Sequence, residues 1–335
     1  WNTPDLKALL ELAIRNRTIL DKAIFGNWYG SIFYRLKHWL RDNSKAGSRK
    51  NIHAHYDLGN AFYTLWLDPT MSYSSAWFSE GSKQDLADAQ REKIGRILNS
   101  LQTKSGDHIL EIGCGWGGLM EEALRTNRAI TGLTLSTEQK AFAEKRLQDV
   151  QSQISNPPSF EVRLQDYRDC KDQFDGIASV EMFEAVGEKH WPEYFEAIAH
   201  CLKAGGKVCI QTIVIADDLF ERYRRNTDFI QQYVFPGGML PSRETFRASA
   251  AKANLKVEEE FAFGIDYAKT LCLWRDSFNQ KLQEVRQLGF DETFIRLWNF
   301  YLMYCAAGFT ERNIDVVQFT LSRQSSQATA DMLSA

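Results

Sequence analysis

A glycine-rich turn between an apolar run and a helical segment constrains this chain more than any other feature. The run at residues 108–110 leads into Glu111-Ile112-Gly113-Cys114-Gly115-Trp116-Gly117-Gly118, and residues 119–124 are predicted to form a helix. In α/β proteins such a unit brings the backbone against a nucleoside-bearing ligand, because glycine has no Cβ to collide with it. The G-x-G-x-G-G spacing differs from the G-x-G-x-x-G dinucleotide fingerprint. A tight connection without a ligand is the alternative.

Strands and helices are predicted to alternate after residue 107, which indicates a parallel sheet with helices on both faces. The predicted strands are residues 108–112, 129–135, 159–164, 174–180, 207–213, 255–263 and 314–322. The predicted helices include residues 83–102, 137–147, 190–201, 267–288 and 291–305. Residues 203–206 are expected to form a tight turn into the fifth strand. The predicted fold class is therefore α/β, a doubly wound, mostly parallel seven-stranded sheet.

Two further segments are predicted to be helical. Residues 3–42 contain a helix start at Thr3-Pro4-Asp5 and a second candidate helix at 25–39. The first helix has an apolar stripe formed by Leu6, Leu9, Leu10, Leu12 and Ala13. Residues 217–247 form a helical, aromatic insertion with a turn at Pro236-Gly237-Gly238, a candidate lid. We therefore expect a basic helical segment at 1–50, a linker at 43–51, and a main domain at 51–335 with a lid insertion at about 215–250.

Composition excludes several classes of protein. The 335 residues are 44% hydrophobic and 25% charged, which is ordinary for a globular chain. A net charge of -3 gives no general indication of nucleic-acid binding, and no apolar run approaches the roughly 20 residues that span a bilayer. The six cysteines are scattered without CxxC pairs, which favours reduced thiols and argues against a metal site. The sequence therefore predicts a cytoplasmic protein without a metal.

Two loops after the next predicted strands carry side chains that suit a nucleoside, since ligands of open α/β sheets bind at the carboxyl ends of the strands. After the second strand no acid is present, so Thr134 or Gln139 would bind the ribose hydroxyls. A helix N-cap is the alternative role for Ser136. After the third strand, Asp166 can accept the adenine amino protons and Tyr167 can stack on the ring. A solvated turn is the alternative there.

Motifs over residues 53–322 occur in the order found in one enzyme family. They are HYDLGN at 55–60, LDPTMSYSSA at 67–76, LEIGCGWGG at 110–118, GLTLS at 132–136, QDYRD at 165–169, MFEAVG at 182–187, FPGGMLPS at 235–242 and FGIDYAKTL at 263–271. With these motifs the chain resembles the cyclopropane-fatty-acyl-phospholipid synthases and their methyltransferase relatives, which are class I S-adenosylmethionine-dependent methyltransferases. The resemblance implies a Rossmann-like fold and covers the first fifty residues only loosely.

The resemblance implies methyl transfer from S-adenosylmethionine to a cis double bond of a phospholipid acyl chain, with S-adenosylhomocysteine as product. The olefin attacks the methyl carbon, and loss of a proton from the resulting carbocation closes a cyclopropane ring. This chemistry needs an aligned nucleophile, a lining of aromatic faces and carbonyls, exclusion of water and a base. In the cyclopropane-forming members the base is taken to be a bound bicarbonate.

The resemblance also assigns candidate site residues. The bicarbonate positions, which are the catalytic candidates, are Ser75, Glu184, Gln211, Ile213 and Tyr301. The cofactor-binding candidates are Tyr73, Ser74, Glu111, Gly113, Gly115, Thr134, Leu135, Gln139, Asp166 and Tyr167. The acyl-tunnel candidates are Phe235, Gly237, Tyr267, Thr270 and Trp274. For the aromatic residues, ordinary core packing is the alternative.

The chain departs from the family pattern at two of the bicarbonate positions, where Ser75 replaces a Cys and Gln211 replaces a His. Ala185 also replaces a His that commonly follows the Glu. Ser and Gln still donate hydrogen bonds to a planar oxyanion, so bicarbonate can bind and a ring can close. A retuned site would instead let the cation lose a different proton and leave a methyl- or methylene-branched chain. Both products stay open at this point.

Residues 31–50 form a basic segment that suits an anionic membrane surface. Its cations are Arg35, Lys37, Arg41, Lys45, Arg49 and Lys50, against one acid, Asp42. Neighbouring aromatic residues that could insert at the interface are Trp28, Tyr29, Phe33, Tyr34 and Trp39. A solvated helix face with its rings packed on the main domain is the alternative. We expect peripheral association with the inner face of the membrane and phospholipid acyl chains as partners, with a homodimer as a further candidate.

Three rival functions are weighed against this one. A methyltransferase for a small soluble acceptor would need neither the aromatic lid nor the basic arm. A lipid-binding or scaffold protein with a degenerate cofactor fold would not need the intact glycine turn, Gln139 and Asp166. A nucleic-acid methyltransferase is disfavoured because the chain has no Asn/Asp-Pro-Pro-Tyr motif and no broad basic face.

Overall fold

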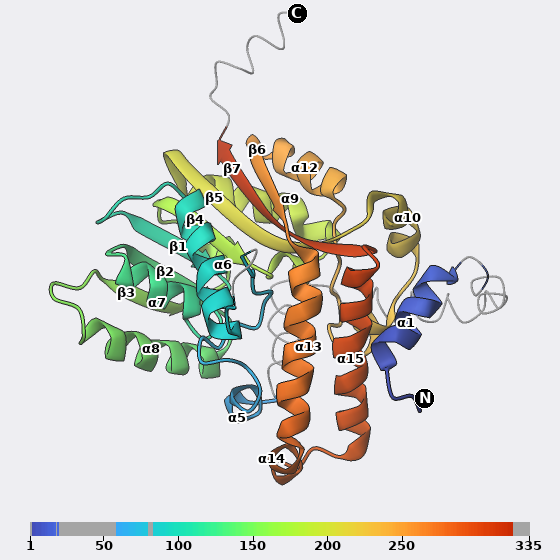
Figure 1. Cartoon of the computed structure of the whole chain (residues 1–335). Coiled ribbons are helices and arrows are strands. Elements are labelled where there is room, and N and C mark those ends of the chain that lie inside the picture. Colours follow the sequence, from blue (N-terminus) through green and yellow to red (C-terminus); the bar gives the residue numbers. More distant parts are fainter. Residues whose placement is uncertain (1, 18, 20–57, 80–82, 324–335) are drawn as a thin grey trace, which may run out of the picture. The chain divides into compact units, whose positions relative to one another are not determined.

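The computed structural model describes residues 2–17, 19, 58–79 and 83–323 (Figure 1). The predicted helix at 25–39, the linker at 43–51 and the basic segment at 31–50 lie outside the described residues. So do His55, Tyr56 and Asp57 of the first motif.

Seven strands form one sheet in the order β3-β2-β1-β4-β5-β7-β6 (Figure 1). Their bounds are β1 His108–Ile112, β2 Ala129–Thr134, β3 Phe160–Leu164, β4 Phe174–Val180, β5 Leu202–Ile215, β6 Leu255–Ala262 and β7 Ile314–Arg323. β1 pairs in parallel with β2 and β4, as do β2 with β3 and β4 with β5, whereas β6 and β7 are antiparallel. The order reverses between β1 and β4, which is the switch point where such sheets bind ligands. The predicted doubly wound, mostly parallel sheet is confirmed.

The fifth strand begins earlier than the sequence predicted. β5 starts at Leu202, so the tight turn predicted at 203–206 is wrong. The register of the β4–β5 ladder shifts between Phe174 and Gly176, and Gly205 adopts a φ of +80°. A bulge of this kind accommodates extra residues while the ladder continues, and glycine tolerates the positive φ.

Helices cover the sheet as the alternation predicted. Their bounds are α6 Leu86–Ser100, α7 Gly118–Arg125, α8 Thr137–Gln151, α9 Trp191–Cys201 and α12 Arg243–Lys252. Leu98, Leu124 and Leu147 from three of these helices are buried in one cluster with Ile109 and Ile130 of the strands. This core fixes the ends of β1 and β2, from which the candidate cofactor loops emerge.

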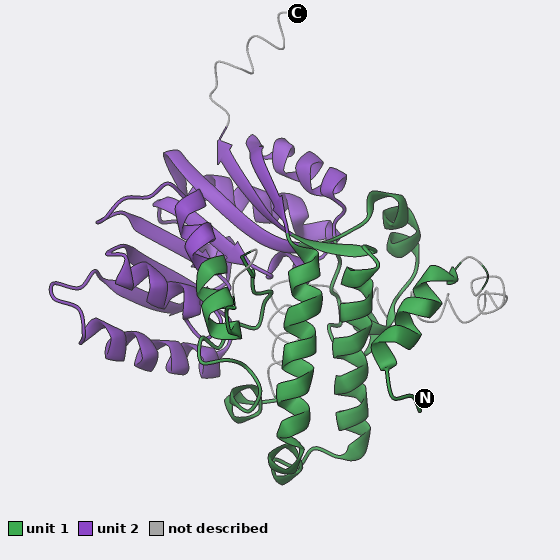
Figure 2. Ribbon diagram, viewed as in Figure 1, with its two compact units in different colours: residues 1–93, 213–240, 263–316 green, residues 94–212, 241–262, 317–335 purple. Residues whose placement is uncertain are grey.

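The chain forms two compact units (Figure 2). The first comprises residues 1–93, 213–240 and 263–316, and the second comprises residues 94–212, 241–262 and 317–335. The remaining helices of the first unit are α1 Leu6–Arg15, α5 Asn60–Thr64, α10 Asp217–Arg225, α11 Phe229–Tyr233, α13 Gly264–Gln280, α14 Leu282–Gln287 and α15 Glu292–Thr310. The single helix predicted at 267–288 is therefore two helices, because the backbone leaves helical geometry at Lys281.

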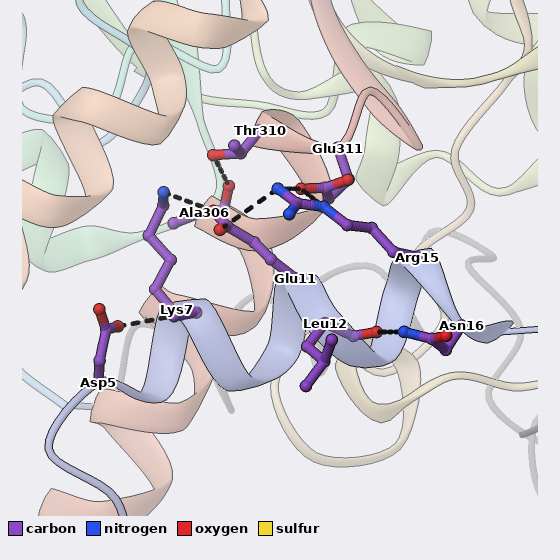
Figure 3. A network of polar contacts seen from close by, with 10 residues as sticks. Asp5, Lys7, Glu11, Leu12, Arg15, Asn16, Ala306, Thr310 and Glu311 are labelled. Atoms are coloured by element: carbon purple, nitrogen blue, oxygen red, sulfur yellow. Dashed lines mark hydrogen bonds and ion pairs between the residues drawn. The ribbon is translucent and has the colours of Figure 1, made fainter.

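Helix α1 packs on α15 and is held there partly by polar contacts (Figure 3). The Asp5 side chain accepts a hydrogen bond from the backbone N–H of Ala8, which confirms the predicted helix start. Arg15 Nη2 lies 2.6 Å from Glu311 Oε1. Leu6 is the buried residue of this helix, whereas Leu12 is 59% exposed, so the predicted apolar stripe is only partly buried. Among the described residues, none of the helices is long and apolar enough to cross a membrane.

Candidate active site

The glycine turn after β1 has the conformation that its sequence predicted. Gly113 and Gly115 adopt φ values of +81° and +51°. A Cβ on Gly113 would lie 2.9 Å from Met182 Cγ, so that glycine is required by packing. A Cβ on Gly115 would meet no protein atom within 4 Å. The backbone at Gly115 therefore borders open space, as the approach of a ligand to the turn requires. Glu111 precedes the turn and is buried in β1.

The loop after β2 brings the two predicted ribose-binding residues together. Thr134 Oγ1 donates a hydrogen bond to Gln139 Oε1 at 2.9 Å, and both residues are buried. Ser136 Oγ accepts from the backbone N–H of Gln139 and caps α8, so the N-cap role foreseen for Ser136 is confirmed. Leu135 directly follows the last residue of β2 and precedes Ser136. The Thr134–Gln139 pair is fixed before any ligand binds.

The loop after β3 contains an ion pair that the sequence analysis missed. The Asp166 carboxylate accepts hydrogen bonds from Arg168 Nε at 2.8 Å and Nη2 at 2.7 Å, and the Arg168 side chain is only 5% exposed. The Tyr167 ring packs edge-on against Tyr194, and burial raises the pKa of Tyr167. The solvated-turn alternative is therefore wrong. The sequence feature that could have predicted this ion pair is the basic residue Arg168, two positions after Asp166.

The end of β4 and the middle of β5 share a second hydrogen-bonded group. Gln211 is fully buried, and its Nε2 donates to Glu181 Oε1 at 2.8 Å. Its Oε1 accepts from Gln318 Nε2 at 3.1 Å. Glu181 follows β4 directly, adopts a φ of +49°, and donates its backbone N–H to the Gln211 carbonyl. Sequence reasoning missed Glu181, although an acid at the end of the apolar run 174–180 was a usable signal.

The remaining bicarbonate candidates belong to different units. Glu184 lies in a short 3-10 turn, Phe183–Ala185, of the second unit, where Gln211 also lies. Ser75, Ile213 and Tyr301 belong to the first unit. Ile213 is two residues beyond Gln211 on β5, so both side chains lie on the same face of that strand.

An aromatic cluster in the first unit contains several predicted residues. The hydroxyls of Tyr73 and Tyr301 are 2.9 Å apart. The Tyr73 ring packs against Tyr63, Trp66 and Trp274, with centroid distances of 5.3, 5.7 and 5.4 Å. Burial raises the pKa of Tyr301 well above its ordinary value, so its hydroxyl stays protonated at neutral pH.

Other predicted acyl-tunnel residues adjoin this cluster. The Phe235 ring centroid lies 6.2 Å from that of Tyr301. The turn after Phe235 is confirmed, since Gly237 has a φ of +84° and Gly238 N donates to Phe235 O. The Tyr267 ring lies 6.2 Å from that of Trp274. The structure thus brings together residues from three separate segments of the first unit.

Residues 74–76 form a short loop in which the hydroxyl groups of Ser74 and Ser75 both take part in hydrogen bonds. Ser75 is fully buried, and its Oγ donates to the Ala76 carbonyl at 2.9 Å. The Ala76 N–H donates to Thr270 Oγ1 on α13. Ser74 Oγ accepts from Lys93 Nζ at 2.7 Å. Neither Lys93 nor this arrangement was anticipated from the sequence.

A doubly wound sheet of this order with a glycine turn after β1 defines the S-adenosylmethionine-dependent methyltransferase class, and this chain is an enzyme of that class. A family model described as mycolic acid cyclopropane synthetase matches residues 43–319. The chain belongs to this family, which confirms the resemblance stated above.

Individual relatives agree with this assignment. The chain is 39% identical over 308 residues to tuberculostearic acid methyltransferase UfaA1 of Mycobacterium tuberculosis, covering 87% of this chain and 71% of that protein. It is 37% identical over 271 residues to the cyclopropane-fatty-acyl-phospholipid synthase of Escherichia coli, covering 80% and 66%. The solved structure of mycolic acid cyclopropane synthase CmaA1 complexed with SAH and CTAB has a TM-score of 0.75, at 31% identity over 82% of this chain and 97% of that one. The chain thus spans about two thirds of the length of the first two proteins.

Proposed function

We propose that this enzyme transfers the methyl group of S-adenosylmethionine to a cis double bond of an unsaturated acyl chain in a phospholipid. The observation that supports this most is the aromatic cluster around Tyr73, Trp274 and Tyr301. Aromatic faces stabilise the positive charge that develops on the alkene and offer it no nucleophile. A tyrosine is already protonated at neutral pH, and burial raises the pKa of Tyr301 further, so the cluster supplies no phenolate that would trap the cation.

The cofactor is proposed to bind along the carboxyl edge of the second unit. The open space at Gly115 fits the close approach of a ligand to the backbone. The Thr134–Gln139 pair suits the ribose hydroxyls, and Asp166, oriented by Arg168, suits the adenine amino group. Glu111, Gly113, Leu135 and Tyr167 complete the proposed set in this unit, and Tyr73 and Ser74 are the proposed cofactor residues of the first unit. When bound, S-adenosylmethionine supplies an electrophilic methyl group on a sulfonium.

Two products are candidates for this chain. Membership of the family supports a cyclopropane ring, for which a base must remove a proton from the added methyl group. One observation favours a methyl- or methylene-branched chain instead, namely the hydrogen bonds of the proposed bicarbonate residues. Gln211 is engaged at both ends of its amide, and Ser75 donates to the Ala76 carbonyl. These two residues therefore fit an anion poorly.

Charge adds to this argument. The carboxylate of Glu181 lies 2.8 Å from the Gln211 amide nitrogen, so a bound anion beside Gln211 would face a like charge. A carboxylate at this position can itself accept a proton. In the branched outcome, the alkene carbon bonds to the methyl as the bond between the methyl and the sulfonium sulfur breaks. A carbon next to the cationic centre then loses its proton to a carboxylate as a new double bond forms. Glu181 and Glu184 are the proposed acceptors in the second unit.

Lipid analysis tests the methyl transfer directly. The full chain is expressed in a host with unsaturated phospholipids, and acyl chains are analysed by mass spectrometry. A gain of one CH₂ group is expected, and hydrogenation followed by fragmentation separates a ring from a branch. If purified enzyme methylates a soluble acceptor but no lipid, the lipid assignment fails. If S-adenosylhomocysteine produces no heat of binding in calorimetry, the cofactor assignment fails. That result would favour a lipid-binding or scaffold protein instead.

Glu181→Gln tests which product the site favours. Removing this charge should raise the ratio of ring to branch at least about fivefold, since one nearby like charge costs about 1 kcal/mol even in water and Gln211 is buried. Glu196→Gln on α9, an exposed carboxylate, is the matched control and should leave the ratio unchanged. A wild-type enzyme that makes rings alone would exclude the branched product.

A further inference from the structure

A buried lysine in the first unit has no role in the function proposed so far. Lys93 of α6 is 1% exposed, and its ammonium nitrogen lies 2.7 Å from Ser74 Oγ. Lysine is almost never buried to this extent unless its charge is paired or used, because removing the charge from water is costly. The position of Lys93 therefore requires an explanation.

The same face of α6 also fixes the backbone next to Ser74. Gln90 lies one turn before Lys93 and is fully buried. Its Nε2 donates to the Ser74 carbonyl at 2.8 Å and approaches the Ser72 carbonyl at 3.5 Å. Residues three apart on a helix share a face, so Gln90 and Lys93 reach the loop together. The backbone and the side chain of Ser74 are thus both positioned from one helix.

An acidic side chain in the same unit interacts with the charge of Lys93. Asp68 is buried, and its carboxylate accepts the backbone N–H of Thr70 at 2.8 Å. Burial raises the pKa of Asp68, and the positive charge of Lys93 opposes that shift. A glutamine could satisfy Ser74 without burying a charge. Lys93 instead places a positive charge next to Ser74.

The donor chemistry sets the direction of the Ser74 hydroxyl. An ammonium group has donors only, so Ser74 Oγ must accept this bond, and its own O–H points elsewhere. Within the described part of the chain, Ser74 Oγ donates no hydrogen bond. A hydroxyl donor next to a buried cation suits an anionic acceptor, because both the hydrogen bond and the charge favour it.

We propose that Lys93 is a positioning residue that turns the Ser74 hydroxyl toward the carboxylate of the methionine part of the cofactor. The proposal rests on the proposed function, since it needs S-adenosylmethionine in the site. It assigns to Lys93 a role through Ser74 and not through direct contact. It also predicts that a change at Lys93 weakens the binding of ligands that carry this carboxylate, and leaves the binding of the nucleoside part alone.

Two probes separate this role from general support of the fold. S-adenosylhomocysteine carries the amino-acid carboxylate, whereas 5′-methylthioadenosine has the same nucleoside and thioether without it. Calorimetry on the full chain should show that Lys93→Met lowers the affinity for S-adenosylhomocysteine about tenfold, as expected for the loss of one charge-assisted hydrogen bond. Binding of methylthioadenosine should change less than about twofold. The proposal would be overturned if Lys93→Met lowered the affinity for both probes equally. It would also be overturned if the affinity for neither probe changed.

Further variants keep the test decisive if Lys93→Met does not fold. Ser74→Ala should reproduce the selective loss of S-adenosylhomocysteine, and adding Lys93→Met to it should cause no additional loss, because both act through one bond. Arg91→Met, an exposed cation on the same helix, is the matched control and should bind both probes as the wild type does. If Ser74→Ala binds both probes normally, the proposal is wrong. A wild-type enzyme that binds neither probe would instead overturn the cofactor assignment.

Discussion

Polar side chains at the candidate site are oriented by neighbouring protein groups. Thr134 is bonded to Gln139, Asp166 to Arg168, and Gln211 to Glu181. A buried polar group without such a bond would cost about 1–3 kcal/mol, so these pairs stabilise the fold. The Thr134–Gln139 and Asp166–Arg168 pairs also fix donors and acceptors before a ligand arrives, which reduces the reorganisation needed for binding. The Gln211–Glu181 bond has the opposite consequence, because it occupies the amide that an anion would need.

The open space at Gly115 leads to a prediction about cofactor binding. Gly115→Ala adds a Cβ that meets no protein atom and only a modest φ strain, so stability should fall by about 1 kcal/mol. Binding of S-adenosylhomocysteine, measured by calorimetry, should fall at least about tenfold if the ligand occupies that space, since a clash removes close backbone contact.

Gly106→Ala is the matched control for this substitution. Gly106 has a φ of +89°, and its Cβ would also meet nothing within 4 Å, but it precedes β1 at the opposite end of the strand. This variant should lose stability and keep its affinity for S-adenosylhomocysteine. Equal affinity in both variants would show that the ligand does not approach Gly115.

The places of the candidate site residues in the fold could be predicted from the sequence, but their hydrogen-bond partners could not. The loop positions of Thr134 and Asp166 follow from the strand ends that precede them. Lys93 bonds a residue 19 positions away and Gln318 one 107 positions away, and no local pattern encodes such contacts. Glu181 was overlooked because its left-handed φ and its bond to Gln211 depend on the β4–β5 register.

At the scale of elements, the short helix α11 positions the turn that contains Phe235 and Gly237. Asp228 caps this helix and forms a capping box with Gln231. Gln231 Nε2 donates to the Gly238 carbonyl at 2.9 Å and to the Tyr223 hydroxyl at 3.2 Å. A five-residue helix has little stability of its own, so these buried bonds determine whether the turn keeps its shape.

Asp228 gives this element a predictable pH dependence. Burial raises the pKa of Asp228 above 3.8, although backbone N–H groups oppose the shift. The folded state therefore holds this proton more tightly than the unfolded state, and its contribution to stability is lost as pH rises above about 3.8. Asp228→Asn keeps the capping oxygen without the charge. It should raise Tm at pH 7 by about 2 °C and lose this advantage near pH 4.

The matched control is Asp291→Asn, which changes the exposed N-cap of α15 in the same way. Asp291 Oδ1 accepts from the backbone N–H of Phe294 at 2.8 Å. This variant should show no comparable gain at pH 7 in thermal scans across the same buffers. A stabilisation of Asp228→Asn that is equal at pH 4 and pH 7 would contradict the argument from charge burial.

Element boundaries were predictable where apolar periodicity coincides with a clear stop. The strands at His108–Ile112 and Phe174–Val180 match their predicted bounds. Glycine misled the prediction for β5, because a bulge and a turn have the same composition. The stripe of α1 was overestimated, since helical periodicity cannot show that α15 covers only part of the helix.

For the molecule as a whole, the candidate residues are distributed over two compact units. The cofactor loops after β1, β2 and β3 belong to the second unit, and the aromatic cluster with the 72–76 loop belongs to the first. Helix α6 and strands β5 and β7 contribute residues to both units. The sequence order of the motifs could not reveal this division, because three separate segments of the chain make up each unit.

The predicted basic segment at 31–50 lies outside the described residues, so its role is tested on the whole chain. We expect sedimentation with anionic vesicles but not with neutral phosphatidylcholine vesicles, because each cation near an anionic surface contributes about 1 kcal/mol. Binding should weaken as salt rises from about 0.05 to 0.5 M, since screening shortens the reach of these charges. Changing Arg35, Lys37 and Arg41 to Gln should reduce binding to anionic vesicles while the affinity for S-adenosylhomocysteine stays the same. Equal binding to neutral and anionic vesicles would mean that apolar contacts, and not these cations, bring the enzyme to its lipid.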